Sequence, residues 1–278
     1  MGTIFRHTLS RMWAQVLGWG LSFAALGWFS VWGYGALAGQ TAQMAELLKA
    51  YPPEVLAFFG SVEQMFTPGG YLDSVFLSYS GLLLGVLAIL LGSGLLVSDE
   101  EAGRLDLIQA YPVSRTALFA GRVAALVVAL VAVVALTWAG CALGLPGSRL
   151  GIGLGALALP FVSLLALLAL AAGLALVLSM ALPSRSLAAT VAAIVLVAGY
   201  TVRSLARVND GLAAVARLSP FNYFQSGYAV DGLNWAWCGG LLAVGAVFTV
   251  LAWWAYQRRD LRVAGEGSWR LPGMARGR

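Results

Sequence analysis

Charged residues are scarce in this sequence. They make up 10% of its 278 residues, whereas hydrophobic residues make up 60%; soluble domains carry about 25% charged residues. With a mean hydropathy of +0.84, the chain is predicted to be an all-α integral membrane protein. The net charge of +5 then reflects orientation in the membrane. It does not predict nucleic-acid binding, because no basic patch with interleaved aromatic residues occurs.

Residues suited to catalysis or metal binding are also few. His7 is the only histidine and neither CxxC nor HExxH occurs, which argues against a Ser/His protease, a metalloprotease and a zinc or haem site. Asp73 and Asp231 are predicted at span edges, so paired intramembrane aspartates are missing as well. We therefore expect no enzyme and no bound cofactor or metal. Cys141 and Cys238 are expected to be small buried residues, and a disulfide between them stays open.

Long apolar runs, in contrast, occur six times. Because a transmembrane helix needs about 20 apolar residues, spans are predicted near residues 16–38, 72–97, 118–145, 153–182, 186–204 and 235–256. Twelve basic residues fall on the side shared by the termini and five on the other, which predicts that both termini face the cytoplasm. Residues 1–264 are expected to form a single transmembrane domain, and 265–278 a flexible basic cytoplasmic tail.

Several segments outside the spans carry weaker patterns. Residues 1–13 predict an amphipathic helix in the membrane interface, or else the first turns of the first span. Residues 208–234 predict short outer re-entrant helices between spans five and six, or else an interfacial loop with aromatic anchors. Whether this segment or residues 39–70 bind a substrate or another protein stays open. Gly81 and Gly85 form a GxxxG pattern that is typical of close helix contacts.

One dense island of charge, residues 99–115, follows the second span. Glu100 and Arg104 are spaced i, i+4, and the acidic residues before them suit a first helical turn. Leu105, Ile108 and Tyr111 share one face, and Pro112 ends the helix. This pattern fits a helix that docks onto another protein. It fits equally well a helical loop that only connects two spans.

The same stretch resembles a known family. EEAGRLDLIQAYPVSR, followed by Gly121-Arg122, is similar to the segment after the second span of ABC-2 type transporter permeases. Arg104 stands where that family usually has Thr, Asp106 where it has Glu, and Arg122 where it has Lys. The resemblance implies a coupling helix that docks onto a separate ATPase subunit. Its residues here are Asp99, Glu100, Glu101, Gly103, Arg104, Leu105, Asp106, Leu107, Ile108 and Tyr111.

The resemblance further implies a second cytoplasmic contact, at Pro183, Ser184 and Arg185, and a substrate path lined chiefly by spans two and five. It implies the permease subunit of an ATP-driven exporter in the bacterial cytoplasmic membrane. Two ATPase subunits would bind ATP and Mg²⁺, and a second permease, identical or homologous, would complete the assembly. The absence of GxxxxGK[ST] in a chain whose only lysine is Lys49 agrees with an external ATPase.

The cargo is less closely defined by the sequence. An almost charge-free interior favours a lipid-like, amphipathic or drug-like substrate over a small ion. Arg203 and Arg207 could meet an anionic group, or extend to lipid headgroups. A channel that needs no ATP, or a membrane assembly factor, is the alternative function, although no ring of charge or filter-like sequence supports a channel.

Overall fold

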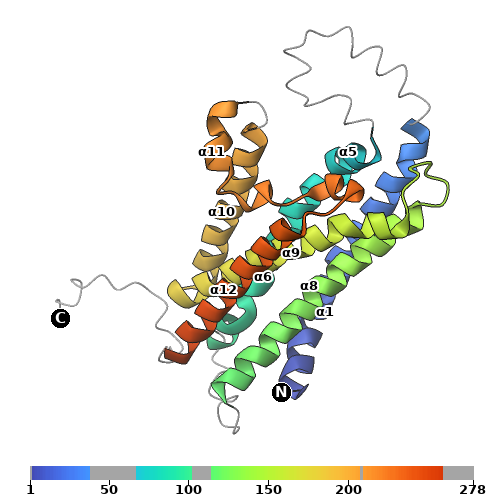
Figure 1. Ribbon diagram of the computed structural model, residues 1–278. Coiled ribbons are helices and arrows are strands. Elements are labelled where there is room, and N and C mark those ends of the chain that lie inside the picture. The colour runs from blue at the N-terminus through green and yellow to red at the C-terminus, as the bar shows by residue number, and fades with distance from the viewer. Residues whose placement is uncertain (1, 38–66, 102–113, 207–208, 259–278) are drawn as a thin grey trace, which may run out of the picture.

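The computed structural model describes residues 2–37, 67–101, 114–206 and 209–258, with only the backbone at 36–37, 99–101 and 210. All the regular structure in these ranges is helical (Figure 1). The predicted basic tail and most of the segment 39–70 lie outside the described residues.

Six helical segments of the described chain are long and apolar enough to cross a membrane, which confirms the predicted number. The second crossing combines α5 (Pro68–Leu72), the π-helix η1 (Asp73–Leu77) and α6 (Ser78–Glu101). The other crossings are α1 (Gly2–Leu37), α8 (Arg115–Gly144), α9 (Leu154–Ala181), α10 (Arg185–Leu205) and α12 (Trp235–Arg258).

The N-terminal arm and the first span form one helix. α1 has 36 residues and is therefore about 54 Å long, well beyond the roughly 30 Å of a bilayer's apolar core. The arm thus corresponds to the first turns of the span, one of the two alternatives for this segment. These turns carry the exposed residues Arg6, His7 and Arg11 past the apolar part of the helix.

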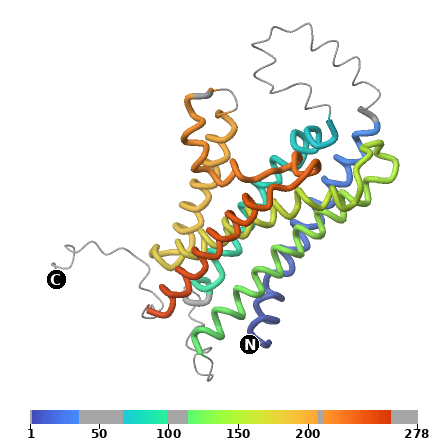
Figure 2. The backbone as a smooth tube through the Cα atoms, in the orientation of Figure 1, coloured from blue at the N-terminus to red at the C-terminus, as the bar shows by residue number. Residues whose placement is uncertain are grey.

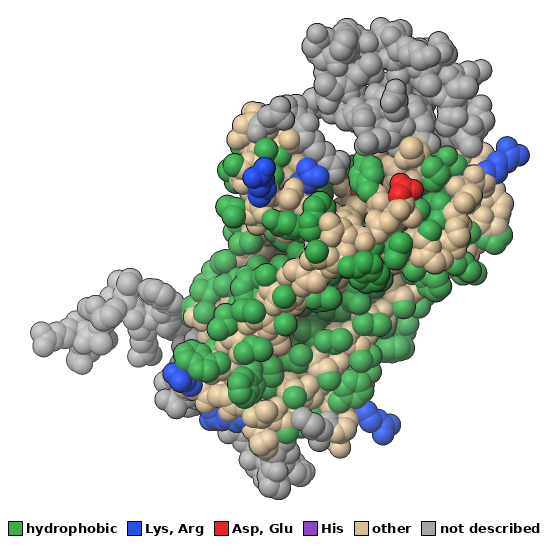
Figure 3. All heavy atoms as spheres, in the orientation of Figure 1, with side chains coloured by type: hydrophobic (Ala, Val, Ile, Leu, Met, Phe, Trp, Pro, Cys, Tyr) green, Lys and Arg blue, Asp and Glu red, His purple; other side chains and the backbone are tan. Residues whose placement is uncertain are grey.

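The start of α1 and the end of α12 lie at the same end of the bundle, which we call the terminal end (Figure 2). Apolar side chains cover much of the face between the two ends, and Lys and Arg side chains lie toward the ends (Figure 3). Large apolar residues such as Phe29, Ile194 and Trp254 are exposed on the surface of the bundle. An apolar surface of this extent suits contact with lipid.

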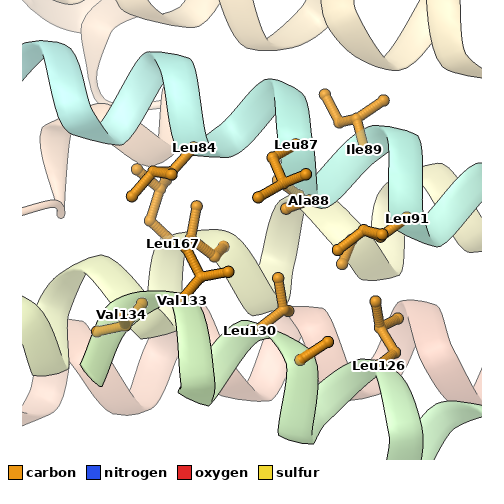
Figure 4. Packing of buried hydrophobic residues seen from close by; sticks show 14 of the residues in the cluster. Leu84, Leu87, Ala88, Ile89, Leu91, Leu126, Leu130, Val133, Val134 and Leu167 are labelled. Carbon is orange, nitrogen blue, oxygen red and sulfur yellow. The ribbon is translucent and has the colours of Figure 1, made fainter. Parts of the chain in front are cut away.

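The core is built around α6 and α9. Leu84 and Leu87 of α6 point toward α8, and Leu167 of α9 packs beside them (Figure 4). Small residues set the closest approaches: a Cβ atom on Gly92 of α6 would lie 2.5 Å from the carbonyl oxygen of Ala172 in α9. Gly140 meets the backbone of Ala24 even more closely. These glycines let helix backbones touch in a lipid-like interior.

The GxxxG pattern has a different role. Gly81 faces the side chains of Phe224 and Leu167, and Gly85 faces Leu196 of α10. Both therefore mark real contacts of α6, but each accommodates a neighbouring side chain and not a second backbone.

The chain between α10 and α12 contains short helices, as predicted, and they pack against the bundle. It contains η2 (Asp210–Leu212), α11 (Ala213–Ala216), η3 (Pro220–Asn222) and η4 (Ser226–Asp231). The Ser219 hydroxyl donates to the carbonyl oxygen of Gly199 in α10 at 2.8 Å. The backbone N–H of Gln225 donates to the Ser163 hydroxyl of α9 at 3.0 Å. We call residues 209–234 the re-entrant segment.

Candidate functional site

The predicted docking residues lie at the terminal end as far as the structure describes them. Asp99, Glu100 and Glu101 form the last turn of α6. The remaining docking residues of the coupling helix, Gly103, Arg104, Leu105, Asp106, Leu107, Ile108 and Tyr111, lie outside the described residues.

The acidic run continues α6, whereas the sequence predicted that it begins a separate helix. No glycine or proline interrupts residues 95–101, so nothing in this stretch stops α6 before Glu101. Negative side chains are unfavourable at a helix C-terminus. Arg122 and Arg185 both lie against the preceding turns of α6, at Leu95 and Gly94.

The second predicted contact lies at the same end. Leu182 is the C-cap residue of α9, and the Ser184 hydroxyl caps α10 by accepting a hydrogen bond from the N–H of Leu187 at 3.2 Å. The Arg185 guanidinium packs on α6, where a Cβ atom on Gly94 would lie 2.8 Å from its Cζ atom. The structure therefore brings Pro183, Ser184 and Arg185 close to the helix that carries the acidic run.

An apolar cavity lies further along the bundle, between α6, α9, α10, α12 and η3. It has a volume of about 500 Å³, large enough for a drug-sized molecule. Ile89 is its lining residue from α6, and Tyr223 and Trp237, whose rings meet edge to face at 5.9 Å, also lie in its wall. The other walls include Leu170, Leu174, Ala192, Val195, Leu196, Leu218, Pro220, Leu241, Val244 and Phe248.

A polar cavity of about 340 Å³ adjoins it, and Trp237 lines both. Among the described residues of its wall, Asp73 is acidic and Arg203 is basic. Hydroxyl and amide groups complete it, from Ser78, Tyr200, Ser204, Asn222, Gln225, Ser226 and Tyr228. The pair of cavities thus offers a polar compartment beside an apolar one.

The position of Asp73 differs most from the position predicted from the sequence. It was placed at a span edge, but its side chain is only 2% exposed and it begins the π-helix η1. The close packing of Gly69 against Gly227 brings the re-entrant segment against the backbone of Asp73. π-Helical turns are frequent at functional sites. The Gly69-Gly70 pair just before this acid is the signal that could have identified it.

In the described residues, no group of three or more His, Cys, Asp or Glu side chains lies close enough together to hold a metal ion. Cys141 of α8 and Cys238 of α12 are both buried free thiols.

Comparison with known proteins places this architecture in a family. The family model described as "Multidrug efflux system permease Rv1217c, C-terminal domain" matches residues 8–257, which include all six crossings almost completely. No curated protein matches the chain. The chain therefore belongs to the family of the multidrug efflux system permease Rv1217c C-terminal domain.

Proposed function

We propose that this chain is the permease subunit of an ABC-2 type exporter. In this proposal a separate ATPase docks at the terminal end, through residues 99–111 and 183–185, and hydrolyses ATP. The permease uses the resulting movement to export a lipid-like, amphipathic or drug-like molecule. In this proposal the chain lies in the bacterial inner membrane with its terminal end facing the cytoplasm, in agreement with the distribution of basic residues.

One observation carries the proposal: a single helix connects the proposed docking end to both cavities. α6 supplies Ser78 to the polar cavity and Ile89 to the apolar cavity, and it ends in the acidic run Asp99–Glu101. Its 24 residues span about 36 Å. A push on its end at Glu101 can therefore reach the cargo space through a nearly rigid element.

The two cavities favour an amphiphile as cargo. The tail of such a molecule would be enclosed by Leu170, Leu196 and Phe248, while its polar group would reach Asp73, Arg203 and Gln225. Trp237 lies at the boundary, and its indole suits the transition between apolar and polar groups. The family description, a multidrug efflux permease, agrees with cargo of this kind.

The proposed assembly has two permeases and two ATPase subunits. α10 is the least buried of the six crossings of the described chain, and Ile194 and Val197 are among its exposed side chains. We propose this face as part of the surface that meets the second permease. The buried helices would then move as a body against it.

Association with an ATPase is the direct test. The chain is purified from its native membranes in mild detergent, and a co-purifying ATPase is identified by mass spectrometry and ATP hydrolysis. Charge reversal by Glu100→Lys with Glu101→Lys should abolish recovery, because it repels the same partner surface. The matched control is Arg217→Glu, a charge reversal at an exposed residue of the re-entrant segment, which should leave recovery unchanged.

Two results oppose the proposal. Undiminished ATPase recovery after the double reversal would remove the docking role of the acidic run. Flux through proteoliposomes that contain this chain alone, without nucleotide, would favour the channel.

A further inference from the structure

Ser226, the first residue of η4, has a hydroxyl group that makes no contribution to the fold. Its side chain is 5% exposed, and Oγ has no hydrogen-bond partner in the described part of the chain. Burying a hydroxyl without a partner costs stability, and such groups are rare in native structures. The Ser226 hydroxyl is therefore available to a group that is not part of the chain.

The backbone of Ser226 is strained as well. Its φ angle is +42°, in the left-handed region that favours glycine. A glycine would adopt this conformation more easily, and the serine hydroxyl forms no bond that compensates the strain. Backbone strain of this kind clusters at ligand-binding sites.

The residues on both sides hold Ser226 in place. The Gln225 side chain accepts a hydrogen bond from the N–H of Asn234 at 2.6 Å and donates to the carbonyl oxygen of Asn234 at 3.0 Å. Gly227 packs so closely on η1 that a Cβ atom would lie 2.5 Å from the backbone nitrogen of Asp73. The position of the hydroxyl is thus fixed by its neighbours.

Ser226 lines the polar cavity of about 340 Å³, together with Asp73 and Arg203. Because the described wall contains both a carboxylate and a guanidinium, it is not built to select a ligand by the sign of its charge. Phe221 and Phe224 add two aromatic rings, which meet edge to face at 6.3 Å. The rest of the wall includes the hydroxyl or amide groups of Ser78, Tyr200, Ser204, Asn222 and Tyr228.

We propose that the polar cavity selects cargo with a hydroxyl-rich head group, and that Ser226 is a specificity-determining residue for it. A head group such as a sugar ring carries hydroxyl groups around its edge and C–H bonds on its faces. It therefore suits a wall of hydrogen-bonding groups and aromatic rings. Water can fill the cavity when cargo is absent, and the head group would replace it. The inference rests on the proposed export function and adds the chemical class of the cargo.

The test measures binding to the full chain in a polyoxyethylene detergent, which has no sugar head group. Radiolabelled octyl glucoside is the ligand, and the competitor is its tetra-O-methyl derivative, which keeps the ring and the tail but has no O–H donor. The wild-type chain should bind the glucoside about tenfold more tightly than the derivative, as expected when one or two neutral hydrogen bonds are lost.

Two variants at one position separate a lost contact from a damaged fold. Ser226→Ala should weaken binding of the glucoside about fivefold, the effect of one neutral hydrogen bond. Ser226→Gly removes the same hydroxyl and also relieves the positive φ, so it should weaken binding equally without lowering Tm. The matched control is Ser80→Ala. Ser80 is fully buried in α6, but its hydroxyl already donates to the carbonyl oxygen of Phe76 at 2.8 Å, so affinity should stay unchanged.

Equal affinity of the wild-type chain for the glucoside and its methylated derivative would overturn the proposal. So would wild-type affinity in both Ser226 variants, or an equal loss in Ser80→Ala. The assay contains no ATPase and measures no transport, so these results would leave the proposed exporter intact. Conversely, binding that depends on Ser226 in a chain that recovers no ATPase would refute the exporter and keep the binding site.

Discussion

Helices α9 and α10 follow one another in the chain, and both are apolar, yet the bundle holds them differently. α9 buries 16 of its 28 residues, whereas α10 buries three of 21, Ala188, Ala192 and Leu196. Those three recur every four residues and so form one narrow stripe. α9 is thus enclosed on most sides, and α10 is attached along one line.

This difference shows what apolarity can and cannot decide in a membrane. Lipid tails are as apolar as leucine, so an exposed helix needs no polar face. How much of a helix is buried depends on how closely neighbouring helices pack against it, and small residues such as Gly92 and Ala172 allow the closest packing. If α9 is the firmly held helix and α10 the loosely held one, equivalent substitutions in the two helices should differ in their effect on stability.

Identical truncations in the two helices should give the largest contrast. Leu167 of α9 is fully buried, and Leu187 of α10 is 42% exposed. Leu167→Ala should lower the free energy of unfolding by about 3 kcal/mol, because it leaves a cavity in the core. Leu187→Ala should change it by less than about 0.5 kcal/mol. Denaturant titration in detergent micelles measures both, and equal losses would contradict the comparison.

Enlarging a glycine should disturb the α6–α9 contact. Gly92→Ala brings a methyl group onto the backbone of Ala172, which cannot move aside as a side chain can, so a loss of about 2 kcal/mol is expected. The control is Gly155→Ala near the start of α9, where the added methyl meets nothing within 4 Å. Thermal unfolding should separate the two variants. An unchanged Tm for Gly92→Ala would mean that the helices can part freely.

The cavity beside α10 extends the comparison to function. Trp237→Ala should weaken apparent cargo affinity about tenfold, because this ring lines both compartments. Trp254 of the same helix is exposed, and the Arg258 guanidinium lies over its ring, with Cζ 3.9 Å from the ring centroid. Trp254→Ala should therefore retain wild-type affinity. Efflux of a fluorescent lipophilic cation, measured over a concentration series, reports both. Equal effects would place the cargo elsewhere.

The smallest effect concerns the start of α10. Ser184→Ala removes the cap on the N–H of Leu187 and should cost about 1 kcal/mol. Ser186→Ala, two positions away at an exposed site, should be close to neutral. Hydrogen exchange of the first turn of α10 is the measurement. Faster exchange in both variants would indicate that the cap is not the cause.

The sequence predicted those features that depend on composition along the chain. The six crossings follow from charge-free runs, and the re-entrant segment follows from Pro220, Gly227 and its aromatic residues. The extension of α6 to Glu101 was missed, because the acidic residues resemble a helix start when the preceding helix is assumed to have ended. Part of the coupling segment stays a prediction, since it lies outside the described residues.

Features that depend on contacts between distant residues could not be predicted. The burial of Asp73 results from Gly69 and Gly227, which are far apart in the chain and touch only in the fold. Arg11, Arg122 and Arg185 lie on three different helices but line one cavity, and no local sequence pattern predicts that they come together. Each basic residue, taken alone, indicated only which face of the membrane it occupies.

The re-entrant segment is bonded at once to the enclosed helix and to the loosely held one, through Ser163 and through Gly199. The segment therefore links the two helices directly. Any swing of α10 away from α9 must drag the segment or break one of its two hydrogen bonds. Movement of α10 relative to α9 is therefore coupled to movement of residues 209–234 as long as both hydrogen bonds are kept.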